Sequence, residues 1–250
     1  MKAIILAAGY ATRLYPLTKD KPKPLLPIGG KPLLNYIMEQ LERLDEVDQV
    51  SIVANHRFAE HFRVWAKGFA TNKKITVLDD GSVCNDTRRG AIGGIVFAMD
   101  EMGIDEETII LCGDNLFTFN LRDYLDFYKK VGGDCVCAKE IDDREKLKSF
   151  AVAQINQNNV VVDFVEKPLV PKSNLAVFGT YIYTRDTMAM FRQYLSGGGN
   201  PDAPGNFPMW LYKQKPLYCY TFEGECFDIG TPEAYEEINK IIHKLAIPHM

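Results

Sequence analysis

Apolar and polar residues alternate along the first half of the chain in blocks of two kinds. Short apolar runs predict strands buried on both faces at 3–7, 50–55, 75–79, 108–113 and 134–140. Between these runs, apolar residues recur at helical spacing, as at Leu34, Ile37 and Leu41, and predict helices over 33–44, 58–67, 91–102 and 121–131. Strands that alternate with helices of this length predict an α/β fold, a three-layer α/β/α sandwich with a Rossmann-like, mainly parallel sheet.

The second half of the chain has a more β-rich pattern. Apolar stretches at 151–156 and 160–166 flank the turn residues 157–159 and predict a β-hairpin. Further strands are expected at 175–184 and 217–223, and short helices at 188–195 and 207–213, with a Gly- and Pro-rich break at 197–206 between the helices. An amphipathic helix over 232–245 closes the chain, because Thr231 suits the N-cap and Pro232 the first helical position.

No repeat, low-complexity tract or linker divides the 250 residues. We therefore expect one domain over 1–250, with an α/β half at 1–140, a hairpin-rich half at 141–230 and the closing helix at 231–250.

The net charge of −4 argues against a nucleic-acid partner, and no apolar stretch approaches the roughly 20 residues of a membrane span. The apolar run at 3–8 is too short for a signal peptide and six cysteines form no C-x-x-C pair, so we expect a cytoplasmic protein with reduced thiols.

The loop after the first predicted strand carries groups that suit phosphate. Gly9 permits close approach of the backbone to a ligand, and Thr12 and Arg13 can donate to phosphate oxygens. Lys23 lies between Pro22 and Pro24, which we expect to hold its backbone extended. The P-loop pattern and the G-x-G-x-x-G pattern are both absent from the sequence, so a dinucleotide cofactor is not expected.

Two aspartates follow apolar segments far apart in the sequence. Asp114 comes just after the buried run at 108–113, and Asp228 lies between Phe227 and Ile229. A carboxylate among apolar neighbours needs a partner or a cation, and Mg²⁺ takes one or two carboxylates together with phosphate oxygens. The alternatives are a helix N-cap for Asp114 and a buried hydrogen-bonded turn for Asp228.

Glu166 and Lys167 end the second strand of the predicted hairpin. A glutamate can accept hydrogen bonds from two vicinal hydroxyls. A lysine directly after it points to the opposite face of an extended chain, so the two side chains can share a ligand only if the backbone twists. The alternative is a charge pair at the end of the strand.

In register, these segments resemble the sugar-1-phosphate nucleotidylyltransferases, and most of all the glucose-1-phosphate thymidylyltransferase branch. The resemblance begins with the loop at 9–25 and continues in order through Gly113-Asp114-Asn115, Val165-Glu166-Lys167-Pro168, the segment 173–182 and Phe227-Asp228-Ile229-Gly230-Thr231. It implies the nucleotide-diphospho-sugar transferase fold, with the nucleotide bound by the first half and the sugar phosphate by the second. It further implies association as a homodimer or homotetramer.

The resemblance also assigns roles to residues. It makes Arg13, Lys23, Asp114 and Asp228 catalytic, with Mg²⁺ held by Asp114 and Asp228. It places the nucleotide against Ala8, Gly9, Thr12, Gly90 and Ala91, and we add Asn85 as a nucleotide-binding candidate from the stretch 79–90, where the sequence departs from the family. It places the sugar phosphate against Gly113, Glu166, Lys167, Gly179 and Thr180, with Glu166 on the sugar hydroxyls, Lys167 on the phosphate and Gly179 close under the sugar.

The sequence departs from the family pattern in four places, one of which is the segment 200–208, which replaces another stretch of that pattern. Ala11 replaces a second glycine, so that its methyl group would crowd the phosphates or its backbone would stay at negative φ. The stretch 79–90 lacks the glutamine that reads the base, and either Asn85 or Thr87 could replace it. The chain also ends soon after its closing helix, so we expect neither a C-terminal left-handed β-helix nor the inhibitor site of longer relatives.

The expected reaction is Mg²⁺-dependent transfer of a nucleoside monophosphate from an NTP, with dTTP or UTP favoured, to a sugar 1-phosphate, with release of pyrophosphate. A first alternative is a cytidylyltransferase that uses CTP and a non-sugar phosphate ester such as phosphocholine. A second is an inactive nucleotide-binding regulatory subunit, although such a subunit would be expected to have lost a lysine or an aspartate from this set.

Overall fold

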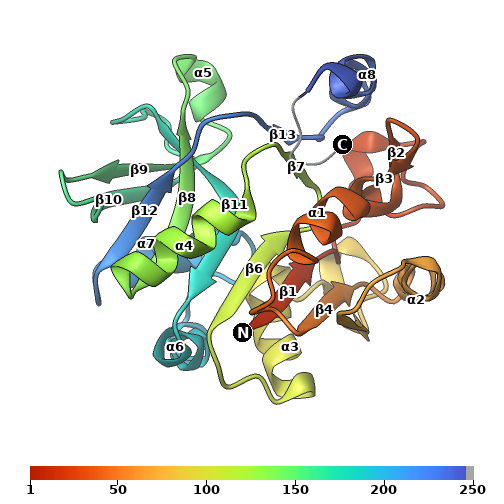
Figure 1. The fold of residues 1–250 in the computed structure, drawn as a ribbon, viewed down its shortest axis with the longest axis horizontal. Coiled ribbons are helices and arrows are strands. Elements are labelled where there is room, and N and C mark those ends of the chain that lie inside the picture. Colours follow the sequence, from red (N-terminus) through yellow and green to blue (C-terminus); the bar gives the residue numbers. More distant parts are fainter. Residues whose placement is uncertain (246–250) are drawn as a thin grey trace.

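The computed structural model describes residues 1–245 and is built around a nine-stranded sheet (Figure 1). Its first half contributes four parallel neighbours in the order β6, β1, β4, β5. Their bounds are Thr108–Cys112, Lys2–Leu6, Gln49–Ala54 and Lys74–Asp79. These are the apolar runs of the sequence. Strand β1 lies between β6 and β4, and both of its faces are covered.

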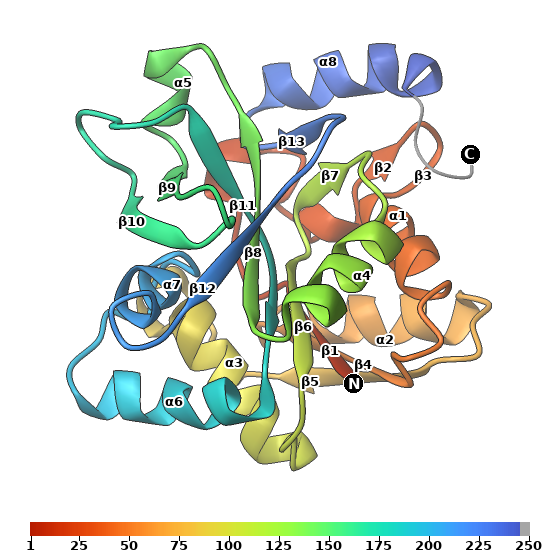
Figure 2. The ribbon, with the colours of Figure 1, turned by 60° about the vertical axis from the view of Figure 1, so that its left-hand side comes forward.

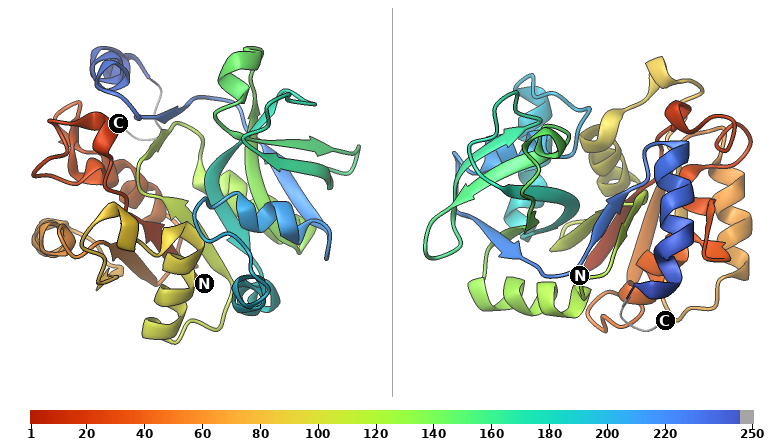
Figure 3. Two further views of the ribbon diagram at one scale, coloured as in Figure 1. Left: turned by 180° about the vertical axis from the view of Figure 1, so that it is seen from behind. Right: turned by 90° about the horizontal axis from the view of Figure 1, so that it is seen from above.

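Helices cover both faces of this sheet. Leu34 of α1, Phe62 of α2 and Tyr124 of α4 pack with Ile5 on one face. Ile95 of α3 packs with Ile4 on the other, where α3 and α6 contact each other (Figure 3). The bounds of these helices are Leu33–Leu41 for α1, Ala59–Gly68 for α2, Gly90–Met102 for α3, Leu121–Val131 for α4 and Arg185–Ser196 for α6. Successive residues of a strand face opposite sides, which explains why Ile4 and Ile5 belong to different cores.

Strand β11 (Leu175–Tyr183) joins the two halves of the chain, because it pairs antiparallel with β8 along one side and with β9 and then β6 along the other (Figure 2). The hairpin partner β10 extends the sheet beyond β9, and β12 runs parallel to β8. The bounds are Asp134–Glu140 for β8, Ala151–Ile155 for β9, Val161–Glu166 for β10 and Leu217–Thr221 for β12. The short helices α5 (Arg144–Leu147) and α7 (Asn206–Leu211) lie in the same half.

Two small ribbons lie outside the main sheet. Strand β7 (Asn115–Phe117) pairs antiparallel with β13 (Cys226–Asp228), and β2 (Pro27–Ile28) pairs with β3 (Lys31–Pro32). Helix α8 (Pro232–Ile241) packs across both ribbons through Ile238 (Figure 2). The register of the first ribbon sets Asp228 opposite Asn115, the residue after Asp114.

The expected α/β sandwich is confirmed, with corrections in detail. The parallel pairings of the first half are joined by antiparallel pairings around β11, so the sheet as a whole is mixed. Helix α1 ends at Leu41 rather than at residue 44, and α8 ends at Ile241 and is followed by a 3-10 turn, Ile242–Lys244. The predicted N-cap is confirmed, since Thr231 Oγ1 accepts a hydrogen bond from the Ala234 N–H at 3.2 Å.

The four ribbon strands were not predicted, because two or three residues carry too little periodicity to be recognised. Residues 246–250 of the predicted closing segment 231–250 lie outside the described part. Within residues 1–245, none of the helices has the length and apolar character needed to cross a bilayer.

Candidate functional site

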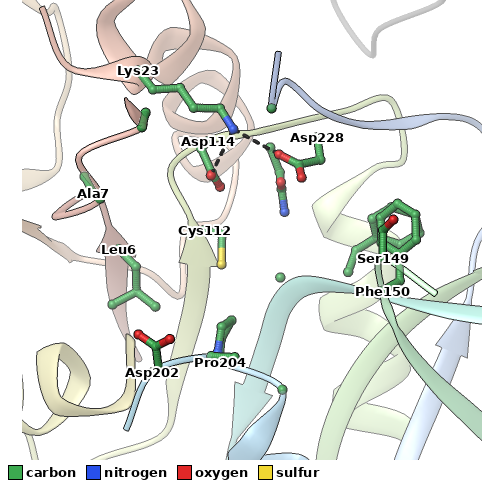
Figure 4. Close-up of a pocket in the computed structure, with 18 of the residues that line it drawn as sticks. Leu6, Ala7, Lys23, Cys112, Asp114, Ser149, Phe150, Asp202, Pro204 and Asp228 are labelled. Carbon is green, nitrogen blue, oxygen red and sulfur yellow. Dashed lines mark hydrogen bonds and ion pairs between the residues drawn. The ribbon is translucent and has the colours of Figure 1, made fainter. Parts of the chain in front are cut away.

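A cavity of about 460 Å³ opens where the parallel strands β1 and β6 end, and residues of both halves of the chain line it (Figure 4). Ligands of open α/β sheets bind beyond the carboxyl ends of such strands. Ten of the fifteen predicted site residues line it: Gly9, Thr12, Arg13, Lys23, Asn85, Asp114, Glu166, Lys167, Gly179 and Asp228. Of the other five, Ala8, Gly113 and Thr180 lie next to lining residues in the chain, while Gly90 and Ala91 follow the lining residue Arg88 by two and three positions.

The loop after β1 brings polar groups to the edge of the cavity. Thr12 and Arg13 are exposed and belong to the 3-10 turn Thr12–Leu14. A Cβ placed on Gly9 would meet no described atom within 4 Å, so the space beside this glycine is open to a ligand. Ala11 adopts φ 46° and ψ 43°, so the expectation that its backbone stays at negative φ is wrong. An alanine in the left-handed region is strained by about 1–2 kcal/mol.

Lys23 is buried, and its ammonium reaches the cavity between two carboxylates. Pro22 is extended, but Lys23 itself begins the 3-10 turn Lys23–Leu25, so the prediction that the Lys23 backbone is extended is wrong. Its Nζ donates to Asp114 Oδ2 at 3.0 Å and to Asp228 Oδ1 at 2.9 Å (Figure 4). Burial alone would lower the pKa of Lys23, but the charges of the two aspartates outweigh it and raise that pKa. The lysine is therefore a permanent cation at neutral pH.

Both aspartates expose part of their side chains to the cavity, 43% for Asp114 and 50% for Asp228. Asp114 is followed by β7 and not by a helix, so the N-cap alternative is wrong. Asp228 is half-exposed and paired with Lys23, so the buried-turn alternative is also wrong. Arg13 lies near this pair, because a Cβ at Gly230 would be 3.9 Å from Arg13 Nη2 and 3.7 Å from Asp228 Oδ2.

The carboxylate pair fits Mg²⁺ in its donor chemistry. One oxygen of each aspartate already contacts the same cation, the Lys23 ammonium, and both side chains are accessible from the cavity. Residues 1–245 contain no group of three or more acidic, histidine or cysteine side chains that could enclose a metal. A magnesium ion here would accordingly take further oxygens from a ligand, as is usual where phosphate is bound.

Glu166 and Lys167 line the cavity together, because the backbone turns between them. Lys167 has φ 48°, which supplies the twist that an adjacent pair on an extended strand needs in order to face one ligand. Its N–H donates to the Phe150 carbonyl at 3.1 Å, which anchors the turn. Strained backbone of this kind concentrates at functional sites.

The Glu166 carboxylate makes no hydrogen bond or ion pair with the residues that the structure describes. Burial raises its pKa, and Lys167 offsets this only in part. The carboxylate packs against Gly205, where a Cβ would approach Glu166 Oε2 to 1.9 Å. Glu166 is thus a partly buried acceptor that faces a cavity without a partner, a costly arrangement that a hydrogen-bond donor on a ligand would relieve.

The floor of the cavity is closely packed. A Cβ on Gly179 would come within 2.4 Å of Cys112 Sγ and 3.1 Å of Asn115 Nδ2, so glycine is required there by neighbouring side chains. Burial, with the charges of Asp114 and Asp228, holds the pKa of Cys112 well above its ordinary value, so this group stays a neutral thiol. Thr180 pairs with Leu111 of β6, and the Gly113 N–H donates to the Leu6 carbonyl, so both belong to the scaffold beneath the cavity.

The N-terminus of α3 is joined to a loop from the other half of the chain. The N–H groups of Ala91 and Ile92 donate to the carbonyls of Asp202 and Pro201, at 3.0 and 2.9 Å. Gly90 has φ 76°, and a Cβ there would lie 2.4 Å from the Pro201 oxygen. The roles predicted for Gly90 and Ala91 in nucleotide binding stay predictions, as does that of Ala8, whose carbonyl accepts a hydrogen bond from Asn55 Nδ2.

The sequence interpretation missed several lining residues. Arg88 Nη2 contacts Asp202 Oδ1 at 2.5 Å, and this ion pair spans the two halves beside Asn85. Asn115, Pro204 and Gly205 also line the cavity. The Gly- and Pro-rich stretch 197–206 was the available signal, but it indicated a loop without showing which surface the loop would contact.

Gly90→Ala and Gly81→Ala form a matched pair of substitutions. Both glycines have φ 76°, but a Cβ at Gly81 meets no described atom within 4 Å. Gly81→Ala should lower the free energy of unfolding by about 1 kcal/mol through backbone strain alone. Gly90→Ala should cost clearly more and should speed amide hydrogen exchange at Ala91 and Ile92. Equal losses from the two substitutions would contradict the contact with Pro201.

Glu166→Gln should stabilise the ligand-free protein at neutral pH by about 1 kcal/mol, because a partly buried charge without a partner is replaced by a neutral amide. The folded-state pKa of Glu166 is raised above 4.5, so its protonation stabilises the fold at low pH, and that contribution is lost as the pH rises through the folded-state pKa. The difference in the free energy of unfolding between Glu166→Gln and the wild type, measured by urea titration, should therefore shrink as the pH falls towards 4.5. Glu223→Gln, at an exposed position, is the control and should show no such trend.

Comparison with known proteins places this geometry in a family. The chain matches the nucleotidyl transferase family over residues 2–244. It is 29% identical over 246 residues to the bifunctional protein GlmU of Methanocaldococcus jannaschii, covering 97% of this chain and 54% of that protein. It is 28% identical over 240 residues to the UTP–glucose-1-phosphate uridylyltransferase AglF of Haloferax volcanii, covering 95% and 94%. The chain spans about half to two thirds of the length of several curated relatives that it matches.

Solved structures agree with the fold. A putative glucose-1-phosphate thymidylyltransferase from Bacillus anthracis, in complex with a sucrose, is 25% identical with a TM-score of 0.79, covering 98% of this chain and 96% of that one. A UDP-glucose pyrophosphorylase complexed with UDP-glucose has the same identity and TM-score, covering 97% and 98%. The family match covers nearly the whole described chain, and the chain therefore belongs to the nucleotidyl transferase family.

Proposed function

We propose that this protein transfers a nucleoside monophosphate from an NTP to a sugar 1-phosphate and releases pyrophosphate. The observation that carries the proposal is the arrangement of charge around one cavity. Lys23, Asp114 and Asp228 form one cluster, and Glu166 and Lys167, at the end of β10, line the same cavity. The first cluster suits a triphosphate and the second a phosphorylated sugar, and a shared cavity would bring the two substrates into contact.

The proposed chemistry asks the protein for positioning and charge, not for a base. A phosphate oxygen of the acceptor is already an anion and can attack the α-phosphorus in line with the leaving pyrophosphate. Lys23 would bind the α-phosphate, Arg13 the leaving pyrophosphate and Lys167 the acceptor phosphate. Mg²⁺ held by Asp114 and Asp228 would neutralise charge on the phosphates. Glu166 would accept hydrogen bonds from sugar hydroxyls.

The choice of base and sugar is the finer part of the proposal. We favour dTTP or UTP with a sugar 1-phosphate because relatives and structural neighbours carry uridylyl- and thymidylyltransferase names. Other relatives are named adenylyltransferase and guanyltransferase, so the nucleotide pocket varies among them. We propose that Asn85 and Arg88, which line the cavity, discriminate between bases. Assembly as a dimer or tetramer stays a prediction from the resemblance.

A pyrophosphate-release assay of four NTPs crossed with several sugar 1-phosphates and phosphocholine tests the reaction. We expect Mg²⁺-dependent release that requires both substrates, with the largest kcat/KM for dTTP or UTP and a sugar 1-phosphate. If pyrophosphate is released only with CTP and phosphocholine, the protein is a cytidylyltransferase and the proposed choice of substrates is wrong. Binding of nucleotide without turnover on any acceptor would contradict the proposal.

Lys23→Ala should lower kcat by about 10²–10³-fold, because it removes a preorganised cation from the phosphates. Lys21→Ala is the matched control in the same loop, since Lys21 is exposed and makes no ion pair or side-chain hydrogen bond within residues 1–245. Circular dichroism should show both variants folded. Near-normal turnover by folded Lys23→Ala would remove the assigned role.

A further inference from the structure

The position of Lys23 has a consequence for metal binding. The proposed function needs this lysine at a phosphate and a divalent cation on Asp114 and Asp228. In the structure the lysine itself occupies the space between those carboxylates, with Nζ at 3.0 and 2.9 Å from one oxygen of each (Figure 4). The side chain is only 7% exposed, so it is held there by packing as well as by charge.

An ammonium and a divalent cation cannot share this place. One oxygen of each carboxylate accepts a hydrogen bond from Nζ, so a divalent cation that bridges the two aspartates would lie against the ammonium or displace it. Two cations at contact distance also repel strongly in a site of reduced solvent exposure. The lysine is tethered and always present, while Mg²⁺ must give up water reluctantly to enter. As long as the ammonium has no other partner, Lys23 is therefore favoured over Mg²⁺ for contact with Asp114 and Asp228.

We propose that Lys23 is an internal competitor of the divalent cation for Asp114 and Asp228, and that nucleotide phosphates open the pair to metal by drawing the ammonium away. The inference rests on the proposed function, since it takes the phosphates and the metal from it. It makes the binding of nucleotide and of metal mutually favourable, and it locates that coupling in one side chain. Metal alone would bind weakly, and metal with nucleotide strongly.

Binding of Mn²⁺ alone, followed by electron paramagnetic resonance, tests the competition without any turnover. Lys23→Met should bind Mn²⁺ at least tenfold more tightly than the wild type, because it frees both carboxylates. Lys21→Met removes a nearby positive charge outside the pair and should leave the affinity unchanged. Adding Asp114→Asn to Lys23→Met should abolish the gain.

Three outcomes separate the inference from the proposed function. If Lys23→Met binds Mn²⁺ no better than the wild type while Asp114→Asn and Asp228→Asn still weaken binding, the competition is overturned and the metal site stands. If a gain appears equally in Lys21→Met, it reflects general charge and the inference also fails. If neither asparagine variant affects Mn²⁺ binding, the metal site of the proposed function fails.

A measurement on the wild type covers the case in which Lys23→Met does not fold. In protein labelled with ¹³C at lysine Cε, the Lys23 signal is assigned by its loss in Lys23→Arg, which keeps the charge. Tripolyphosphate without metal should shift this signal, because the ammonium leaves the carboxylates. An unmoved Lys23 signal, in a sample where other lysine signals report binding, overturns the inference.

Discussion

The contact on which the site depends is the bridge from Lys23 to the two aspartates. It joins Lys23 in the first loop of the chain to Asp114, which is 91 positions further along the sequence, and to Asp228, which is 205 positions further along. Two acidic side chains this close repel each other, and a cation between them turns that repulsion into attraction. The short β7–β13 ribbon makes the arrangement possible, since its register sets Asp228 opposite Asn115 and so beside Asp114. A slip of one residue would turn Asp228 to the other face of the ribbon.

Around this bridge, several residues have energetically unfavourable conformations or surroundings that a bound ligand would relieve. Ala11 and Lys167 both have positive φ although neither is a glycine, and Glu166 is partly buried without a partner in the described residues. These positions belong to the cavity lining. Burial of both faces of the sheet stabilises the fold and offsets the free energy that the strained site costs.

The cavity also forms a junction between the two halves. The carbonyls of residues 201 and 202 satisfy donors at the start of α3, and the Arg88–Asp202 pair lies next to them. The loop from the second half is thereby attached to the N-terminus of α3. Residues of both halves line the cavity, so neither half has the complete lining by itself.

The sequence by itself determined the layered α/β fold and most of the chemical groups of the site. Apolar periodicity reports burial along a strand or helix, and the Gly-Asp and Glu-Lys motifs follow elements whose ends share one edge of the sheet. Tertiary structure alone decided the placement of Lys23 between Asp114 and Asp228, the left-handed backbone of Ala11 and Lys167, and the junction of Arg88 with Asp202. These features arise from contacts between residues far apart in the chain and from strain that only the packed neighbours impose, and no local pattern of residues records either.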